Sequence, residues 1–99
     1  QVMCMSWKVF LITKNLLVLN RQGIHARPAG MIVDITSRSE SEVTFRYQDV
    51  TANARAILNV MMLAVIPGAE LEVTIEGEDE LDTMSKLEQL FEDKFHEEV

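Results

Sequence analysis

The stretch AELEVTIE, residues 69–76, decides the fold class because apolar and polar side chains alternate strictly along it. Ala69, Leu71, Val73 and Ile75 hold one set of alternate positions, and glutamate and threonine residues hold the other. Successive side chains of a strand point to opposite faces, so this pattern predicts a strand with one buried and one solvated face. Such strands are typical of antiparallel sheets that are covered on one side only.

Three further stretches predict strands of the same sheet. EVTFRYQ, residues 42–48, repeats the alternation. FLITKNLLVL, residues 10–19, contains another strand, although its continuous apolar run leaves the register open. DVTAN, residues 49–53, predicts a short strand that returns from 42–48 as a hairpin, even though the connecting Gln-Asp lacks the glycine that such turns favour.

Three segments predict helices. The first begins at about Pro28, because proline suits an early helical position, where its missing N–H would be unpaired anyway. The second covers about 54–65, with Asn53 as its cap, and the third covers 79–95. Apolar residues recur along the third at near-helical spacing: Leu81, Met84, Leu87, Leu90, Phe91 and Phe95. The order of elements predicts an α+β fold with helices on one face of a sheet.

The bulk composition fits one domain and excludes several kinds of partner. The chain has 99 residues, 47% of them hydrophobic, and a net charge of −7. Residues 1–39 carry five basic and one acidic side chain, whereas residues 40–99 carry four basic and fifteen acidic ones. The chain has no cluster of basic residues that could bind nucleic acid. It also has no apolar run long enough to insert into a membrane. The acidic segments 76–82 and 92–98 are expected to be solvated faces.

The cysteine and histidine content bears on compartment and metal binding. Cys4 is the one cysteine, which is typical of a reducing compartment, so we expect a cytoplasmic protein. His25 and His96 lack the spacing to cysteines or carboxylates that a metal site needs. We therefore expect no metal and no cofactor.

The stretch GIHARPAG, residues 23–30, carries the candidate chemistry. If a helix begins near Pro28, unpaired backbone N–H groups and the helix dipole create an anion site beside His25. Arg27 adds a fork of donors that matches phosphate oxygens, and Gly23 lets the backbone turn without a Cβ clash. A neutral imidazole nitrogen is a nucleophile near physiological pH, so His25 is a credible phosphoryl acceptor.

GIHARPAG resembles the phosphorylation-site signature of the histidine-containing phosphocarrier (HPr) family of the bacterial phosphoenolpyruvate-dependent phosphotransferase system. The stretch TANARAILNVMMLAVIPGAELEVTIEGEDE, residues 51–80, is similar to the second half of that family. The resemblance covers residues 12–99, and residues 1–11 are expected to be an N-terminal extension. It implies an open-faced sandwich, in which three helices cover one face of a four-stranded antiparallel sheet.

The resemblance also implies the function and the roles of individual residues. His25 would accept a phosphoryl group on Nδ1 from enzyme I and pass it to an enzyme IIA-type protein. Arg27 would be its charge partner, and the backbone at Ala26 and Arg27 would cradle the phosphate. The chain would be a monomeric, stoichiometric carrier rather than an enzyme. Ile57, Leu58 and Met61 would lie next to the histidine loop; because the second helix is apolar around its circumference, they are candidates for partner docking or for core.

Two alternatives stay open at this point. The family's regulated serine falls on Ala56, which has no hydroxyl, and this resembles the nitrogen-related branch more than the sugar-transporting one. A regulatory carrier without sugar transport is therefore one alternative. The other is a non-catalytic binding module of the same fold, in which His25 has only a structural role.

Overall fold

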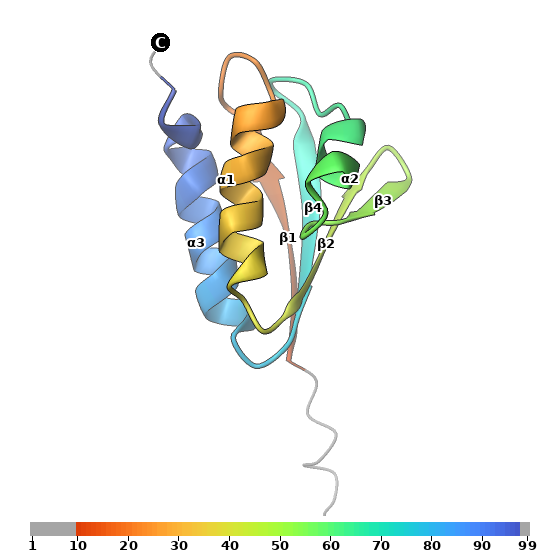
Figure 1. Ribbon diagram of the computed structural model, residues 1–99, viewed down its shortest axis with the longest axis vertical. Helices are drawn as coiled ribbons and strands as arrows, with labels where there is room; N and C mark the ends of the chain where they lie inside the picture. Colours follow the sequence, from red (N-terminus) through yellow and green to blue (C-terminus); the bar gives the residue numbers. More distant parts are fainter. Residues whose placement is uncertain (1–9, 98–99) are drawn as a thin grey trace, which may run out of the picture.

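The structure is a computed structural model that describes residues 10–97, so Cys4 and most of the expected N-terminal extension lie outside the described residues. Its elements are β1 (Leu11–Leu17), α1 (Ala26–Ser37), β2 (Glu42–Tyr47), β3 (Val50–Asn53), α2 (Ile57–Met62), β4 (Glu70–Glu76), α3 (Glu80–Glu92) and the 3₁₀ turn η2 (Lys94–His96). The four strands form one antiparallel sheet in the order β1-β4-β2-β3. This arrangement confirms the predicted α+β fold (Figure 1).

The stretch 69–76 contains β4, which is an interior strand of the sheet. Leu71, Val73 and Ile75 are fully buried, as their alternation predicts. β4 pairs with β1 on one side, where Leu16 lies opposite Leu71, and with β2 on the other, where Val43 lies opposite Ile75. The apolar positions of three strands therefore meet on one face of the sheet.

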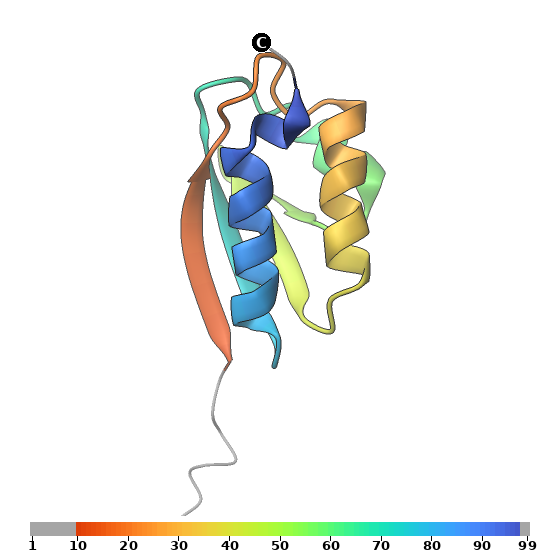
Figure 2. The same cartoon turned by 90° about the vertical axis from the view of Figure 1, so that its left-hand side faces the viewer.

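The helices cover that apolar face and leave the other face open. Figure 2 shows α1 and α3 side by side on the same side of the sheet. Each helix contributes fully or almost fully buried side chains to the core: Ile32 from α1, Val60 from α2, and Leu87 and Phe91 from α3. Within residues 10–97, none of the helices combines the length and the apolar composition that crossing a bilayer requires.

The hairpin between β2 and β3 forms without a glycine. Gln48 and Asp49 connect the strands as a two-residue turn, and both have positive φ, at 52° and 64°. This is the geometry of a type I′ turn, whose twist matches that of the flanking strands. Asp49 also accepts a bond from Arg46 across the turn at 3.0 Å, which supports the tight connection.

Helix α1 begins two residues earlier than predicted. Its first residue is Ala26, so His25 is the N-cap and Pro28 is the third helical residue. Proline is tolerated there for the reason used in the prediction, since the first helical N–H groups have no partner within the helix.

Helix α2 is shorter than predicted at both ends. It covers only Ile57–Met62, and its N-cap is Ala56 rather than Asn53. The Asn53 side chain instead accepts the backbone N–H of Arg55 at 2.9 Å and stabilises a turn before the helix. The helix ends because Ala64 adopts a left-handed conformation, with φ at 54°.

The third helix stops before Phe95. α3 ends at Glu92, and the chain then takes positive φ values at Lys94, Phe95 and His96. This reversal turns Phe95 back into the core, where it is fully buried against Phe91 with ring centroids 4.8 Å apart. Leu81, predicted as part of the apolar stripe, is 68% exposed.

The acidic segments do not lie entirely in solvent. Asp79, at the N-cap of α3, accepts hydrogen bonds from the hydroxyls of Ser39 and Ser41 and from the backbone N–H of Glu40. Glu97, whose side chain is only 14% exposed, is the second exception. Both carboxylates are held by partners from distant parts of the chain, so the expectation of solvated faces was wrong for these two residues.

Candidate histidine site

His25 lies at the junction between a loop and a helix. Its backbone is extended, its carbonyl accepts the N–H of Ala29 at 2.9 Å, and its side chain does not cap the helix. The ring is therefore free to face outward, and the side chain is 37% exposed. A visiting protein can reach this imidazole.

Gly23 sets the path of the loop that delivers His25. Its φ is 71°, and a Cβ there would lie 2.3 Å from the carbonyl oxygen of Val65. The next residue, Ile24, is buried and donates its N–H to that same carbonyl at 3.1 Å. These contacts confirm that the loop needs a glycine to pass this close to the chain before β4.

Behind the ring, one carboxylate oxygen joins the loop to the C-terminal segment. Oε2 of Glu97 lies 3.1 Å from Nε2 of His25 and accepts Nδ2 of Asn20 at 2.9 Å. Asn20 is 99% buried, at 1% exposure, and also donates to the carbonyl of Gly23 at 2.7 Å. The hydrogen bond from Asn20, followed by that from His25, lowers the pKa of the Glu97 carboxyl below its usual 4.5.

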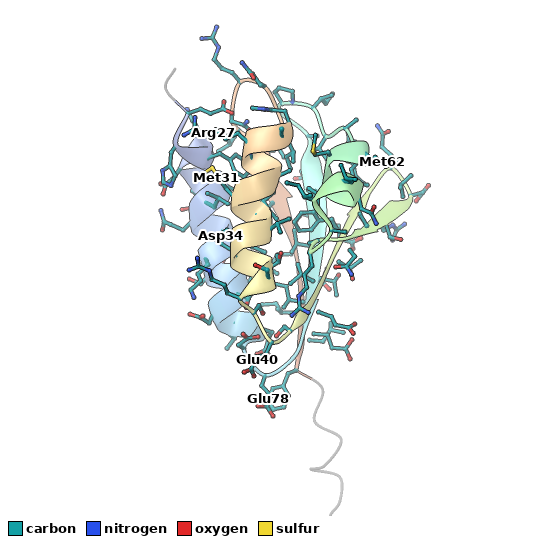
Figure 3. All side chains as sticks on the ribbon, viewed as in Figure 1. Arg27, Met31, Asp34, Glu40, Met62 and Glu78 are labelled. Carbon is teal, nitrogen blue, oxygen red and sulfur yellow. The ribbon has the colours of Figure 1, made fainter. Side chains whose placement is uncertain are left out.

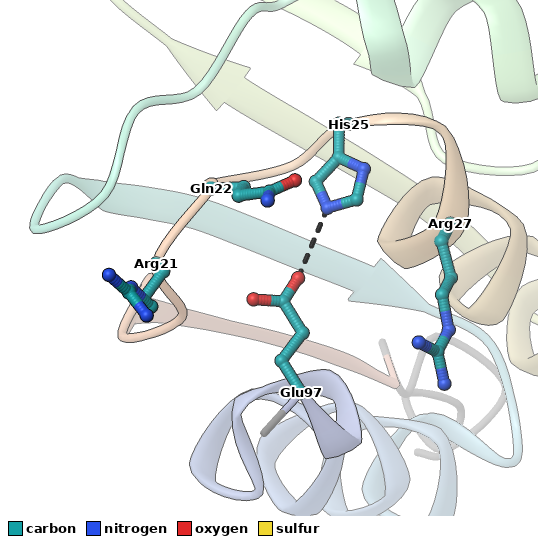
Figure 4. Close-up of a pocket in the computed structure, with 5 residues that line it drawn as sticks. All are labelled: Arg21, Gln22, His25, Arg27 and Glu97. Carbon is teal, nitrogen blue, oxygen red and sulfur yellow. Dashed lines mark hydrogen bonds and ion pairs between the residues drawn. The ribbon is translucent and has the colours of Figure 1, made fainter. Parts of the chain in front are cut away.

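The other side chains of the site surround an open pocket. Arg21, Gln22, His25, Arg27 and Glu97 line it, and its volume is about 660 Å³ (Figure 4). Arg27 is exposed, and its guanidinium makes no ion pair or hydrogen bond with any residue between 10 and 97. The pocket thus presents two arginines and an imidazole to solvent.

The start of α1 adds main-chain donors to this pocket. The N–H groups of Ala26 and Arg27 belong to the first helical turn, so the helix itself offers them no acceptor. Pro28, which follows, has no N–H to leave unpaired. Together with the positive end of the helix dipole, these groups suit a small anion next to His25.

Sequence reasoning gave no role to four members of this arrangement: Asn20, Arg21, Gln22 and Glu97. Asn20 carries a weak local signal, as a polar residue that ends an apolar run. Glu97 carries none, because 72 positions separate it from His25 and only the turn after α3 brings it back.

The predicted docking residues divide into two groups. Leu58 is 68% exposed and Ile57 is 39% exposed. Met61 is only partly exposed and packs against the core, whereas Met62, which the sequence did not single out, is 80% exposed. Figure 1 shows α2 beside the end of α1 at which the helix begins, so these side chains lie at the His25 end of the molecule.

The fold and the site define a class: small open-faced α+β sandwiches that present a histidine at the N-terminus of their first helix. The family model described as "PTS HPr component phosphorylation site" matches residues 12–93. The chain therefore belongs to the HPr family of the phosphotransferase system.

Individual relatives agree with this membership. "Phosphocarrier protein HPr" of Treponema pallidum is 43% identical over 88 residues, which cover 89% of this chain and all of that protein. The same-named protein of Xylella fastidiosa (strain 9a5c) is 36% identical over 89 residues, covering 90% of this chain and all of that protein. The crystal structure of HPr-C-His from Thermoanaerobacter tengcongensis superposes with a TM-score of 0.85 at 32% identity, covering 89% of this chain and 99% of that one.

Proposed function

We propose that this chain accepts a phosphoryl group on Nδ1 of His25 from enzyme I, at the expense of phosphoenolpyruvate, and passes it to an enzyme IIA-type protein. One observation carries the proposal most directly. Nε2 of His25 is held by Glu97, while Nδ1 has no hydrogen-bond partner within residues 10–97. The unengaged nitrogen of a partly exposed ring is the one available for reaction.

The surroundings of the ring support a phosphoryl group that is held and then released. The N–H groups of Ala26 and Arg27 and the Arg27 guanidinium can donate to phosphate oxygens once the group is on the ring. Arg27 is exposed and on a flexible side chain, so it can follow the phosphate without sealing it from an acceptor protein. Moderate binding of this kind suits a carrier.

On this proposal the protein is a stoichiometric carrier and not an enzyme. It offers one acceptor nitrogen per chain, and the partner proteins supply the rest of the chemistry, so the proposal requires no cofactor or metal in this chain. It further places the protein in the cytoplasm and has it act as a monomer, which light scattering in solution would test. A related HPr from Thermoanaerobacter tengcongensis has been crystallised as a dimer, which makes that measurement worthwhile.

Partners would dock on an apolar surface beside the ring, which we call the α2 patch: Ile57, Leu58 and Met62. These side chains are exposed, and Ile57 lies next to Gly30 of α1, where an added Cβ would be 3.9 Å from its Cδ1. Exposed apolar side chains that cluster at one end of a small protein are typical of docking surfaces. Met61, which was also predicted to dock partners, is partly buried and packs against the core.

The first test is phosphorylation of the purified protein by enzyme I, Mg²⁺ and phosphoenolpyruvate. We expect one acid-labile phosphate per chain, mapped to His25 by mass spectrometry of peptides. His25→Ala should take up none, and His96→Ala, the matched control on the other histidine, should take up as much as the unmodified chain. Phosphate on the His25→Ala variant would refute the site.

The two alternatives differ from the proposal in sugar uptake in one case and in phosphorylation in the other. A regulatory carrier would be phosphorylated at His25 but would support no sugar uptake. Ala56, at the N-cap of α2, favours this alternative because it has no hydroxyl at the position of the family's regulated serine. A binding module would remain unphosphorylated and would retain its partner when His25 is replaced.

A further inference from the structure

The turn after α3 places the carboxylate of Glu97 against the histidine loop. Two residues earlier, Phe95 is fully buried, and the positive φ values of Lys94, Phe95 and His96 turn the chain back toward the loop. Glu97 itself is 14% exposed, less than the ring it contacts. Figure 4 shows its side chain directed at His25 from the helical layer below.

Asn20 completes the support. Its Nδ2 donates to Oε2 of Glu97 at 2.9 Å and to the Gly23 carbonyl at 2.7 Å, so both amide hydrogens are used. Its Oδ1 is buried without a partner among residues 10–97. Burying the unpaired Oδ1 of Asn20 is unfavourable. The two hydrogen bonds that Nδ2 donates offset this cost, and one of them holds Glu97.

The bond from Glu97 determines which ring nitrogen carries the hydrogen. An ionised carboxylate only accepts hydrogen bonds, so Nε2 must be the donor in the 3.1 Å contact. In a neutral imidazole the other nitrogen then carries the lone pair. That nitrogen is Nδ1, which faces away from Glu97.

We propose that Glu97 is a positioning residue, which holds the Nε2–H of His25 so that the Nδ1 lone pair is presented to the phosphoryl donor. The inference rests on the proposed function and adds to it a residue that lies beyond the matched range 12–93.

The reaction balances without moving the Nε2 proton. The Nδ1 lone pair forms the N–P bond as the bond from phosphorus to the donor breaks, and that electron pair leaves with the donor. The ring becomes positively charged, and the carboxylate of Glu97 stabilises this charge through Nε2–H. In onward transfer a nucleophile of the acceptor protein forms a bond to phosphorus as the N–P bond breaks. The electron pair of that bond returns to Nδ1, and the ring is again neutral with its hydrogen on Nε2.

Three variants separate the hydrogen bond from the charge. Glu97→Ala removes both, Glu97→Gln keeps an acceptor oxygen but removes the charge, and Glu92→Gln, on an exposed residue of α3, is the matched control for loss of one negative charge. The primary readout is the ¹⁵N spectrum of the neutral His25 ring, which distinguishes the two tautomers and needs no phosphoryl donor. The second is the rate of phosphorylation by enzyme I.

We expect the unmodified chain, Glu92→Gln and Glu97→Gln to hold the Nε2–H tautomer, and Glu97→Ala to give a mixture of both. Phosphorylation of Glu97→Ala should slow by about tenfold, the size expected for a lost hydrogen bond to a charged group, and that of Glu97→Gln by less. An unchanged tautomer in Glu97→Ala, or faster phosphorylation of that variant, would overturn the role of Glu97. A native chain that takes no phosphate would instead refute the proposed function, whatever the tautomer.

Discussion

Two arginines illustrate how position decides the role of a residue. Arg55 stabilises the fold: its Nε donates to the carbonyl of Thr36 at 3.1 Å, and its Nη2 donates to the carbonyls of Ser39 and Ser41. Arg27 is exposed at the entrance of the histidine pocket, without a partner in the described part of the chain. The same guanidinium chemistry therefore supports the fold in one place and remains available for a ligand in the other.

Replacing Arg27 by alanine should affect transfer and not folding. We expect phosphorylation of Arg27→Ala to slow by roughly tenfold, because a charged hydrogen-bond donor to phosphate is lost. The free energy of unfolding should change by less than about 0.5 kcal/mol, as is usual for exposed residues without partners. Urea denaturation and rapid-quench phosphorylation measure the two effects. Arg38→Ala, on an exposed arginine at the other end of α1, is the control and should leave the rate unchanged.

At the scale of elements, a polar cluster locks α3 to the loop between α1 and β2. Asp79, at the start of α3, accepts from the hydroxyls of Ser39 and Ser41, and Ser39 also bonds Thr83 of α3 at 2.8 Å. Figure 3 places the neighbouring Glu40 and Glu78 at the end of the molecule remote from Arg27. The cluster therefore belongs to the frame of the protein and is separate from the histidine site.

Asp79→Ala should destabilise the protein in a pH-dependent way. The bond from Ser41, followed by that from the Glu40 N–H, lowers the pKa of Asp79 below its usual 3.8. The carboxylate therefore contributes stability that is fully present above pH 3.8 and is lost as the pH falls through the lowered native pKa. We expect a loss of about 1–3 kcal/mol at neutral pH, because buried hydroxyls lose their acceptor.

Urea denaturation of Asp79→Ala and the unmodified chain across the acid range measures this effect. The two stabilities should converge as the pH falls below 3.8, whereas Glu78→Gln, on an exposed neighbour, should track the unmodified chain throughout. A difference that stayed constant down to the lowest pH would mean that the carboxylate charge does not contribute.

At the scale of the whole molecule, the histidine end is separated from the acidic start of α3. The α2 patch and the histidine pocket lie at the end where α1 begins, and the acidic N-terminal turn of α3 lies at the other end (Figures 1 and 3). A partner that seats on Ile57, Leu58 and Met62 would therefore meet the ring without approaching the Asp79 cluster.

Leu58→Glu should weaken docking without harming the fold. The side chain is 68% exposed, so the substitution removes apolar contact area and adds a charge at the surface that we expect partners to cover. We expect the KM of enzyme I for this carrier to rise about tenfold, with little change in kcat, as for a moderately important interface residue. Leu81→Glu, equally exposed at 68% on α3, is the matched control. Equal KM values for the two variants would place the docking surface elsewhere.

Features of this fold that depend on neighbouring residues were predictable from the sequence, whereas features that depend on distant contacts were not. β4 and β2 were predictable because alternation is a local pattern. The candidate site was predictable from GIHARPAG because its loop, glycine and helix start are neighbours in sequence. The ends of α2 and α3 were not predictable from the sequence, because left-handed residues at Ala64 and Lys94 end the helices and no local pattern indicates these positions. The glycine-free hairpin formed because pairing on both sides of the turn outweighs the weak preference of Gln48 and Asp49.

By itself, the sequence determined the sheet, the layer of helices and the position of the candidate histidine, since strand periodicity and the start of a helix depend on consecutive residues. Only the tertiary structure decided which side chains hold the His25 ring in place. Asn20, His25 and Glu97 meet because Phe95 is drawn into the core and the chain bends back at that point. A contact across 72 positions depends on how all the elements pack, and no local pattern of residues records it.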